Sequence, residues 1–301
     1  MNLKEKIQKL KKEKNAVILC HYYQRPEIQE VADYIGDSYY LSKIGKESME
    51  NTIVFCGVKF MAESAKILSP QKSILFPNIN AGCPMADMAT LKQVKEFKKE
   101  NPNVKIVCYV NSSSEVKALS DVCCTSSNAI KIINKLDCDR ILFLPDKNLG
   151  SYIQEKVKDK EIILWKGFCV SHSRIDKKEV LKVKNSVENL ITLAHPECEK
   201  EIREEADFIG STGQMIDYIS KSLNKDFLVL TEEGILHTLN KNNPDKNFYT
   251  LDSNITCSNM KKVTLNDVYE SLLYGKHDVK LEEDIMNKAY KSLNNMHILS
   301  K

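Results

Sequence analysis

Three cysteines recur at nearly equal intervals along the chain and could together bind a metal. Cys169 lies 86 residues after Cys83, and Cys257 lies 88 residues after Cys169. Thiolates are ligands for zinc and for iron–sulfur clusters, and a set of three leaves one coordination position open for a substrate. These residues therefore predict either a catalytic metal ion or a [4Fe-4S] cluster with one free iron, and their spacing leaves both open.

Polar triplets follow three short apolar runs at the same spacing. They are His21-Tyr22-Tyr23, Tyr109-Val110-Asn111 and His195-Pro196-Glu197. Tyr109 lies 88 residues after His21, and His195 lies 86 residues after Tyr109. Histidine and glutamate can act as a general acid/base pair, and tyrosines can add further proton donors. We therefore predict catalytic roles for His195, Glu197, Tyr23 and Tyr109.

A third set of residues predicts an anion pocket. Ser126 lies 88 residues after Ser38, and Thr212 lies 86 residues after Ser126. Each precedes or opens a helical pattern, where free backbone N–H groups and the helix dipole favour anions. N-capping alone accounts for any one of them. Three around one centre, with the adjoining Asp37 and Ser211, predict binding of a carboxylate or phosphate.

The repeated spacing also predicts the elements that position these groups. Short apolar runs separated by helical patterns indicate βα units with buried parallel strands. The strands are predicted at residues 17–20, 52–55, 74–76, 105–108, 140–144, 162–165, 191–194, 227–230 and 248–251. Ligands of parallel sheets collect beyond the carboxyl ends of the strands, where every triplet stands.

We therefore expect three tandem α/β/α modules with parallel sheets, related by a pseudo-threefold axis around a central site. Their predicted ranges are 1–83, 84–169 and 170–257. The remaining residues, 258–301, show helical periodicity and are expected to pack against the first module.

Composition excludes several other classes of protein. The 301 residues include 44 basic and 41 acidic side chains, and a net charge of +3 disfavours nucleic-acid binding. No uninterrupted apolar stretch is long enough to span a membrane, and residues 1–14 lack the apolar core of a signal peptide. We therefore expect a cytoplasmic protein whose ten cysteines are free thiols.

Cys169 and His172 form a C-x-x-H pair that could provide two ligands to one metal. No histidine stands at the equivalent position after Cys83 or Cys257. We therefore favour a role for His172 in substrate contact or proton transfer beside the metal.

The chain resembles the quinolinate synthase family (quinolinate synthetase A) from about residue 16 to residue 270. The motifs that carry the resemblance are HYYQRPEIQ at 21–29, GDS at 36–38, GVKFMAE at 57–63, AGCPMA at 81–86, YVNS at 109–112, CTSSNA at 124–129, LPDKNLG at 144–150, WKGFC at 165–169, HPEC at 195–198, TEEG at 231–234 and CSNMK at 257–261. Together these motifs are highly specific.

The resemblance implies a triangular assembly of three modules around one [4Fe-4S] cluster, held by Cys83, Cys169 and Cys257. It implies condensation of iminosuccinate with dihydroxyacetone phosphate to quinolinate, phosphate and water for NAD biosynthesis. An L-aspartate oxidase or aspartate dehydrogenase would supply the iminosuccinate. The implied substrate-binding residues are His21, Ser38, Tyr109, Asn111, Ser126, His195, Glu197 and Thr212, with Tyr23 and His172 close by.

Two other functions stay open from the residues alone. The same three thiolates could serve a zinc-dependent lyase or hydrolase. The chain could instead be an iron–sulfur sensor without turnover, although the many polar groups expected around the metal disfavour this interpretation.

Overall fold

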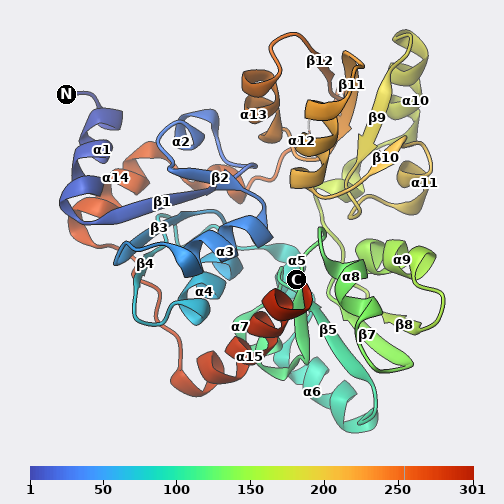
Figure 1. The fold of residues 1–301 in the computed structure, drawn as a ribbon, viewed down its shortest axis with the longest axis horizontal. Coiled ribbons are helices and arrows are strands. Elements are labelled where there is room, and N and C mark those ends of the chain that lie inside the picture. The colour runs from blue at the N-terminus through green and yellow to red at the C-terminus, as the bar shows by residue number, and fades with distance from the viewer. Residues whose placement is uncertain (254) are drawn as a thin grey trace.

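The computed structural model describes residues 1–253 and 255–301. Three α/β modules lie at the corners of a triangle (Figure 1). Within the described ranges, no helix combines the length and the apolar character needed to cross a membrane.

Each module contains one four-stranded sheet in which every pairing is parallel. The strand orders are β2-β1-β3-β4, β6-β5-β7-β8 and β10-β9-β11-β12. The strands are β1 (Ala16–His21), β2 (Tyr34–Gly36), β3 (Thr52–Cys56), β4 (Ser73–Leu75), β5 (Lys105–Tyr109), β6 (Val122–Cys124), β7 (Arg140–Leu144), β8 (Glu161–Leu164), β9 (Ile191–Ala194), β10 (Phe208–Ile209), β11 (Asp226–Leu230) and β12 (Asn247–Tyr249). The predicted fold class is confirmed, and the module boundaries stay a prediction.

Helices connect the strands and cover the sheets (Figure 1). They are α1 (Leu3–Glu13), α2 (Pro26–Gln29), α3 (Ser38–Glu47), α4 (Lys59–Leu68), α5 (Pro84–Asp87), α6 (Leu91–Glu100), α7 (Ser114–Leu119), α8 (Ala129–Asn134), α9 (Lys147–Lys156), η1 (His172–Arg174), α10 (Lys177–Ser186), α11 (Lys200–Arg203), α12 (Thr212–Lys221), α13 (Ile235–Asn242), η2 (Met260–Lys262), α14 (Leu265–Tyr274) and α15 (Glu283–Leu299). All six residues of β1 are buried, as expected of a strand covered on both faces.

Each sheet has one short edge strand that was not predicted from the sequence. These strands are β2, β6 and β10. An aspartate just before each of them ties it to the neighbouring strand. The Asp33 carboxylate accepts the Ile18 N–H at 2.8 Å, and the Asp33 N–H donates to the Ile18 carbonyl. Asp121 and Asp207 make the same pair of contacts in the other modules. These aspartates are spaced by 88 and 86 residues, so the repeat includes the edge strands.

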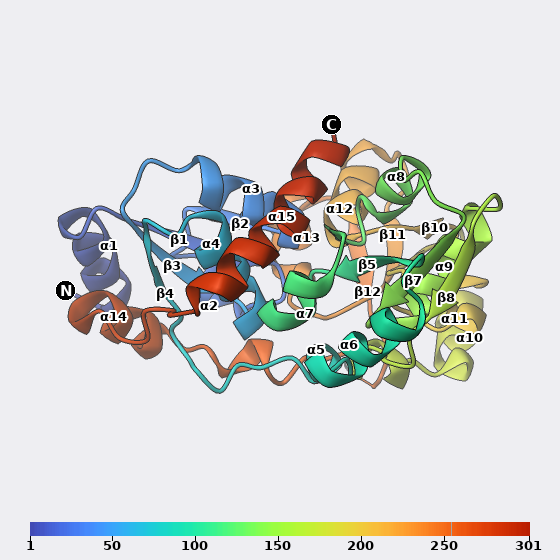
Figure 2. The same cartoon turned by 90° about the horizontal axis from the view of Figure 1, so that it is seen from below.

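The C-terminal segment packs against two modules. Helix α14 contacts α1 and β3, as expected for a segment covering the first module. Helix α15 contacts α4 but packs mainly on α7 and β6 of the second module, and Figure 2 shows it crossing beside α4 and α7. The segment thus packs on the first module through α14 and α15, as expected, while most contacts of α15 are with the second module, which was not expected. Its buried Leu293 and Met296 contribute to a core shared by both modules.

Candidate active site

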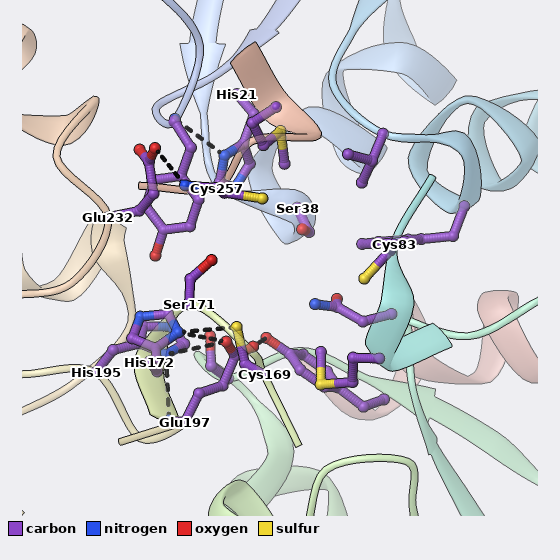
Figure 3. Close-up of a pocket in the computed structure, with 18 of the residues that line it drawn as sticks. His21, Ser38, Cys83, Cys169, Ser171, His172, His195, Glu197, Glu232 and Cys257 are labelled. Carbon is purple, nitrogen blue, oxygen red and sulfur yellow. Dashed lines mark hydrogen bonds and ion pairs between the residues drawn. The ribbon is translucent and has the colours of Figure 1, made fainter. Parts of the chain in front are cut away.

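A cavity of about 80 Å³ lies where the three modules meet. It is lined by residues that follow strands of all three sheets, and their side chains point into it (Figure 3). The predicted site residues that line it are His21, Tyr23, Asp37, Ser38, Cys83, Tyr109, Asn111, Ser126, Cys169, His172, His195, Glu197, Thr212 and Cys257. The structure thus brings together every predicted site residue except Ser211, while the role of each stays a prediction.

The three repeated cysteines line this cavity from equivalent loops. Cys83 directly precedes α5, and Cys169 and Cys257 stand three residues before the first residue of η1 and of η2. In each case the backbone N–H three residues further on, that of Ala86, His172 or Met260, lies near the sulfur. Such N–H groups favour a thiolate.

Burial opposes the charged form of these cysteines when no metal is bound. It raises the pKa of Cys83 to about 12 and also raises the pKa values of Cys169 and Cys257. The thiols are therefore neutral at physiological pH in the metal-free chain. A metal must release their protons as it binds.

The spacing of the sulfurs tests which metal group fits. Tetrahedral zinc with Zn–S bonds of about 2.3 Å places two sulfurs about 3.8 Å apart. The sulfurs of Cys83, Cys169 and Cys257 do not all lie within 4.8 Å of one another. The three sulfurs are therefore too widely spaced to bind one zinc ion together as they stand, whereas in an iron–sulfur cluster each thiolate would bind a different iron.

Five side chains form a hydrogen-bonded relay across the cavity. The Tyr23 hydroxyl lies 2.6 Å from Thr231 Oγ1, which lies 2.9 Å from His172 Nε2. His172 Nδ1 lies 2.9 Å from Glu197 Oε2, and the Tyr109 hydroxyl donates to Glu197 Oε1 at 2.6 Å. If His172 carries its proton on Nδ1, every donor in the relay points towards Glu197. In that tautomer Glu197 accepts hydrogen bonds from both His172 and Tyr109.

The electrostatics of the relay fix its charge. Burial alone would raise the pKa of Glu197, but His195 and the hydrogen bonds from His172 and Tyr109 hold it well below its ordinary value. Burial, reinforced by the Glu197 charge, raises the pKa values of Tyr23 and Tyr109 well above the ordinary value. The relay thus presents one carboxylate acceptor, Glu197, beside two protonated phenols.

His21 and His195 occupy equivalent positions in the first and third modules. His21 Nδ1 accepts the Tyr23 N–H at 3.1 Å, and His195 Nδ1 accepts the Glu197 N–H at 3.2 Å. Burial, with His195 adding to it, lowers the pKa of His21 to about 3, and burial lowers that of His195 to about 4. Both rings are therefore neutral and carry the proton on Nε2.

Polar groups near helix N-termini form part of the cavity wall. Ser38 and Thr212 are the first residues of α3 and α12, and Ser126 precedes α8. Asp37 caps α3 and has its pKa raised by burial. Ser211 caps α12 and lies beside Asp37 and Thr212 of the cavity wall, although it is not among the described residues that line the cavity. Its role in binding stays a prediction.

Asn111 offers a buried acceptor that has no hydrogen-bond partner among the residues the structure describes. Its Oδ1 is shielded from solvent, and the residue lines the cavity after β5. A buried amide oxygen without a donor is costly, so a ligand in the cavity is its natural partner.

Thr231, Asp146, Glu232 and Lys261 make contacts at the site that were not predicted from the sequence. Thr231 connects Tyr23 to the relay, and Lys261 forms a 2.8 Å ion pair with the buried Glu232. Contacts between distant segments carry no local signal, so the motifs that contain Thr231 and Lys261 could not reveal these two contacts. Glu232 lies 86 residues after Asp146, so the repeat could have found that pair.

The described residues include one compact group that could hold a single metal ion. One ligand atom from each of Cys169, His172 and Glu197 lies within 4.8 Å of the other two. The relay accounts for the His172 and Glu197 positions without a metal.

Known proteins match this chain over nearly its whole length. A model of the family of quinolinate synthetase A proteins matches residues 5–298. Quinolinate synthase of Clostridium perfringens (strain SM101) is 60% identical over 299 residues, which are 99% of each chain. Quinolinate synthase of Clostridium acetobutylicum is 57% identical over 301 residues, 100% of this chain and 99% of the relative. That of Clostridioides difficile (strain 630) is 53% identical over 300 residues, with 100% and 99% coverage.

Proposed function

The chain belongs to the quinolinate synthetase A family, and we propose that it condenses iminosuccinate with dihydroxyacetone phosphate. The product is quinolinate, released with phosphate and two molecules of water, for NAD biosynthesis. One observation carries the proposal: three equivalent thiols, a proton relay and an unpaired acceptor line one cavity. This combination supports anion binding, metal binding and proton transfer at a single place.

Cys83, Cys169 and Cys257 would hold the cofactor. A [4Fe-4S] cluster bound there with one open iron supplies Lewis acidity towards an oxygen or carboxylate of the substrate. The remaining cysteines among the described residues lie outside the cavity lining, which leaves no fourth thiolate for the cluster.

The chain's own groups bind the two anionic substrates. Ser38, Ser126 and Thr212 offer hydroxyls near helix N-termini, where phosphate and carboxylate are favoured. The Nε2–H groups of the neutral His21 and His195 add donors that do not depend on pH near neutrality.

Glu197 and the two tyrosines move the protons. The Glu197 carboxylate accepts a proton as the carbon–carbon bond forms, because it is the one charged acceptor of the relay. The Tyr109 and Tyr23 hydroxyls donate protons to oxygens that leave as phosphate or water. His172 and Thr231 carry a proton from the protonated Glu197 back to Tyr23, which restores the starting state of the relay.

The proposal implies a supplier of iminosuccinate, a short-lived imine. An L-aspartate oxidase or aspartate dehydrogenase would make it, and both enzymes would work with this chain in the cytoplasm.

The proposal is tested by an anaerobic turnover assay. The purified chain is given iminosuccinate generated in the reaction, with dihydroxyacetone phosphate, and quinolinate is measured by chromatography. We expect quinolinate and an equal amount of phosphate, and neither when dihydroxyacetone phosphate is omitted. Phosphate release without quinolinate would contradict the condensation.

One observation favours a second candidate, a zinc-dependent lyase or hydrolase. Cys169, His172 and Glu197 could bind one zinc ion with an open position. Stoichiometric zinc without sulfide, and turnover that requires zinc, would support this candidate.

A further inference from the structure

One residue position beside each of the three cysteine loops is repeated in all three modules. It lies two residues after the end of the strand that comes third along the chain in each module. These residues are Val58 after β3, Asp146 after β7 and Glu232 after β11. They are spaced by 88 and 86 residues, in register with the other repeated motifs.

The backbone after each of these residues holds the adjacent cysteine loop in the same way. The following N–H donates to the carbonyl two residues before the cysteine. The pairs are Lys59 with Ala81 at 2.9 Å, Lys147 with Gly167 at 2.7 Å and Glu233 with Ile255 at 3.0 Å. The three loops are therefore structurally equivalent.

Two of the three positions add a carboxylate contact to the cysteine itself. Asp146 Oδ2 accepts the Cys169 N–H at 3.1 Å, and Glu232 Oε1 accepts the Cys257 N–H at 3.0 Å. Val58 stands at the third position and has no side-chain oxygen to offer. The contact therefore depends on a carboxylate side chain at this position and not only on the backbone fold.

The two carboxylates are fully buried but are stabilised by different neighbours. Asp146 Oδ1 caps α9 by accepting the N–H groups of Asn148 and Leu149. Glu232 instead pairs with Lys261 and accepts the Gly234 N–H through Oε2. What the two share is the contact with the cysteine amide, so helix capping alone does not explain the pair.

We propose that Asp146 and Glu232 are positioning residues that orient Cys169 and Cys257 for metal binding, while Cys83 relies on its backbone alone. The proposal rests on the proposed function, because it takes the iron–sulfur cluster as the bound group. Fixing a ligand's main chain before the metal arrives lowers the entropy lost on binding, and such outer partners typically change metal affinity about 10- to 100-fold.

The test compares the intact chain, with its cluster, before and after removal of each contact. Asp146→Asn and Glu232→Gln keep the size of the side chain but place an amide where one carboxylate stood. Asp146→Ser retains an oxygen for capping α9 and loses the reach to Cys169, so it tests the contact even if Asp146→Asn folds poorly. Asp121→Asn is the matched control, because Asp121 also accepts a backbone N–H but lies at the other end of a strand.

Iron and sulfide contents, the rate of cluster loss to a chelator and the electron paramagnetic resonance spectrum of the reduced cluster are measured without oxygen. We expect Asp146→Ser and Glu232→Gln to lose the cluster about 10-fold faster than wild type, with altered spectra. Asp121→Asn should keep the wild-type rate and spectrum.

Variants that keep wild-type cluster loss and spectra would overturn the proposal while leaving the proposed function intact. A wild-type chain that takes up no iron and sulfide would overturn the proposed cofactor, and this proposal with it.

Discussion

The first and third modules carry the same residue, a histidine, at one repeat position. Two positions later they carry different residues. His21 and His195 each accept the N–H of the residue two positions later through Nδ1, and both are buried and neutral. That later residue is Tyr23 in the first module and Glu197 in the third. The repeat therefore fixes where a side chain stands, and substitution within the repeat decides whether it donates or accepts a proton.

The same two modules differ at the cysteine loops. Cys257 has its N–H held by the buried Glu232, whereas Val58 occupies the equivalent place beside Cys83. One symmetrical scaffold thus supports an asymmetric site. This asymmetry suits the proposed reaction, in which two different substrates bind beside one metal group.

The largest effect is expected from Glu197→Gln, which removes the acceptor that the third module provides. The amide is neutral and would place N–H groups against Tyr109 or His172. We expect kcat to fall by about 10²- to 10⁴-fold with the cluster retained. Steady-state kinetics with the iron content as control would test this, alongside Glu201→Gln on the protein surface. Full turnover by Glu197→Gln would exclude its acid/base role.

A smaller effect is expected from Tyr23→Phe, which removes the donor of the first module. The variant breaks the 2.6 Å link to Thr231, so kcat should fall by about 10-fold or more. Thr231→Val breaks the same link, and the double variant should be little slower than the slower single variant. Additive losses in this double-mutant cycle would show that the two side chains act separately.

The two buried histidines predict a loss of stability in acid. Their folded-state pKa values of about 3 and about 4 lie below the ordinary 6.5, so the unfolded chain binds more protons in between. Stability is therefore retained above pH 6.5 and falls as the pH drops below it, by about 1.4 kcal/mol per pH unit for each histidine. Urea unfolding of the metal-free chain between pH 7 and pH 5 measures the slope, and His21→Asn should reduce it. An unchanged slope in His21→Asn would contradict the assignment.

The smallest effect is expected from Val58→Thr, which separates helix capping from cysteine positioning. Val58 is the N-cap residue of α4 and makes no side-chain cap hydrogen bond. A threonine hydroxyl can cap α4, so the free energy of unfolding should rise by up to about 1 kcal/mol. The threonine lacks the reach of the Glu232 carboxylate, so the rate of cluster loss should stay unchanged. Slower cluster loss in this variant would show that capping itself holds the cysteine loop.

Much of the fold could be predicted from the sequence, because buried parallel strands produce continuous apolar runs that repeat at 86 and 88 residues. The runs at 17–20 and 52–55 lie within β1 and β3, and the run at 74–76 overlaps β4. The edge strand β2 could not be found from apolar character, since it has three residues and a partly exposed surface. The repeated Asp33 was a usable signal that was missed.

The convergence of the site residues could also be predicted, because equivalent strand ends must meet in a threefold arrangement. The relay through Thr231 and the Lys261–Glu232 ion pair could not, since each depends on side chains that meet only after the modules pack. The position of α15 was beyond reach for the same reason. The sequence of α15 shows an apolar face but not the surface that this face covers. In the folded chain that surface is formed mainly by α7 and β6.

The central claim is that Cys83, Cys169 and Cys257 hold one iron–sulfur cluster at the site of quinolinate formation. It is tested most directly by measuring iron, sulfide, zinc and quinolinate turnover in one anaerobic sample. About four irons and four sulfides per chain with turnover are expected, both lost in Cys83→Ala and both kept in Cys138→Ala, a half-buried cysteine outside the cavity. Zinc without sulfide in an active sample would contradict the claim.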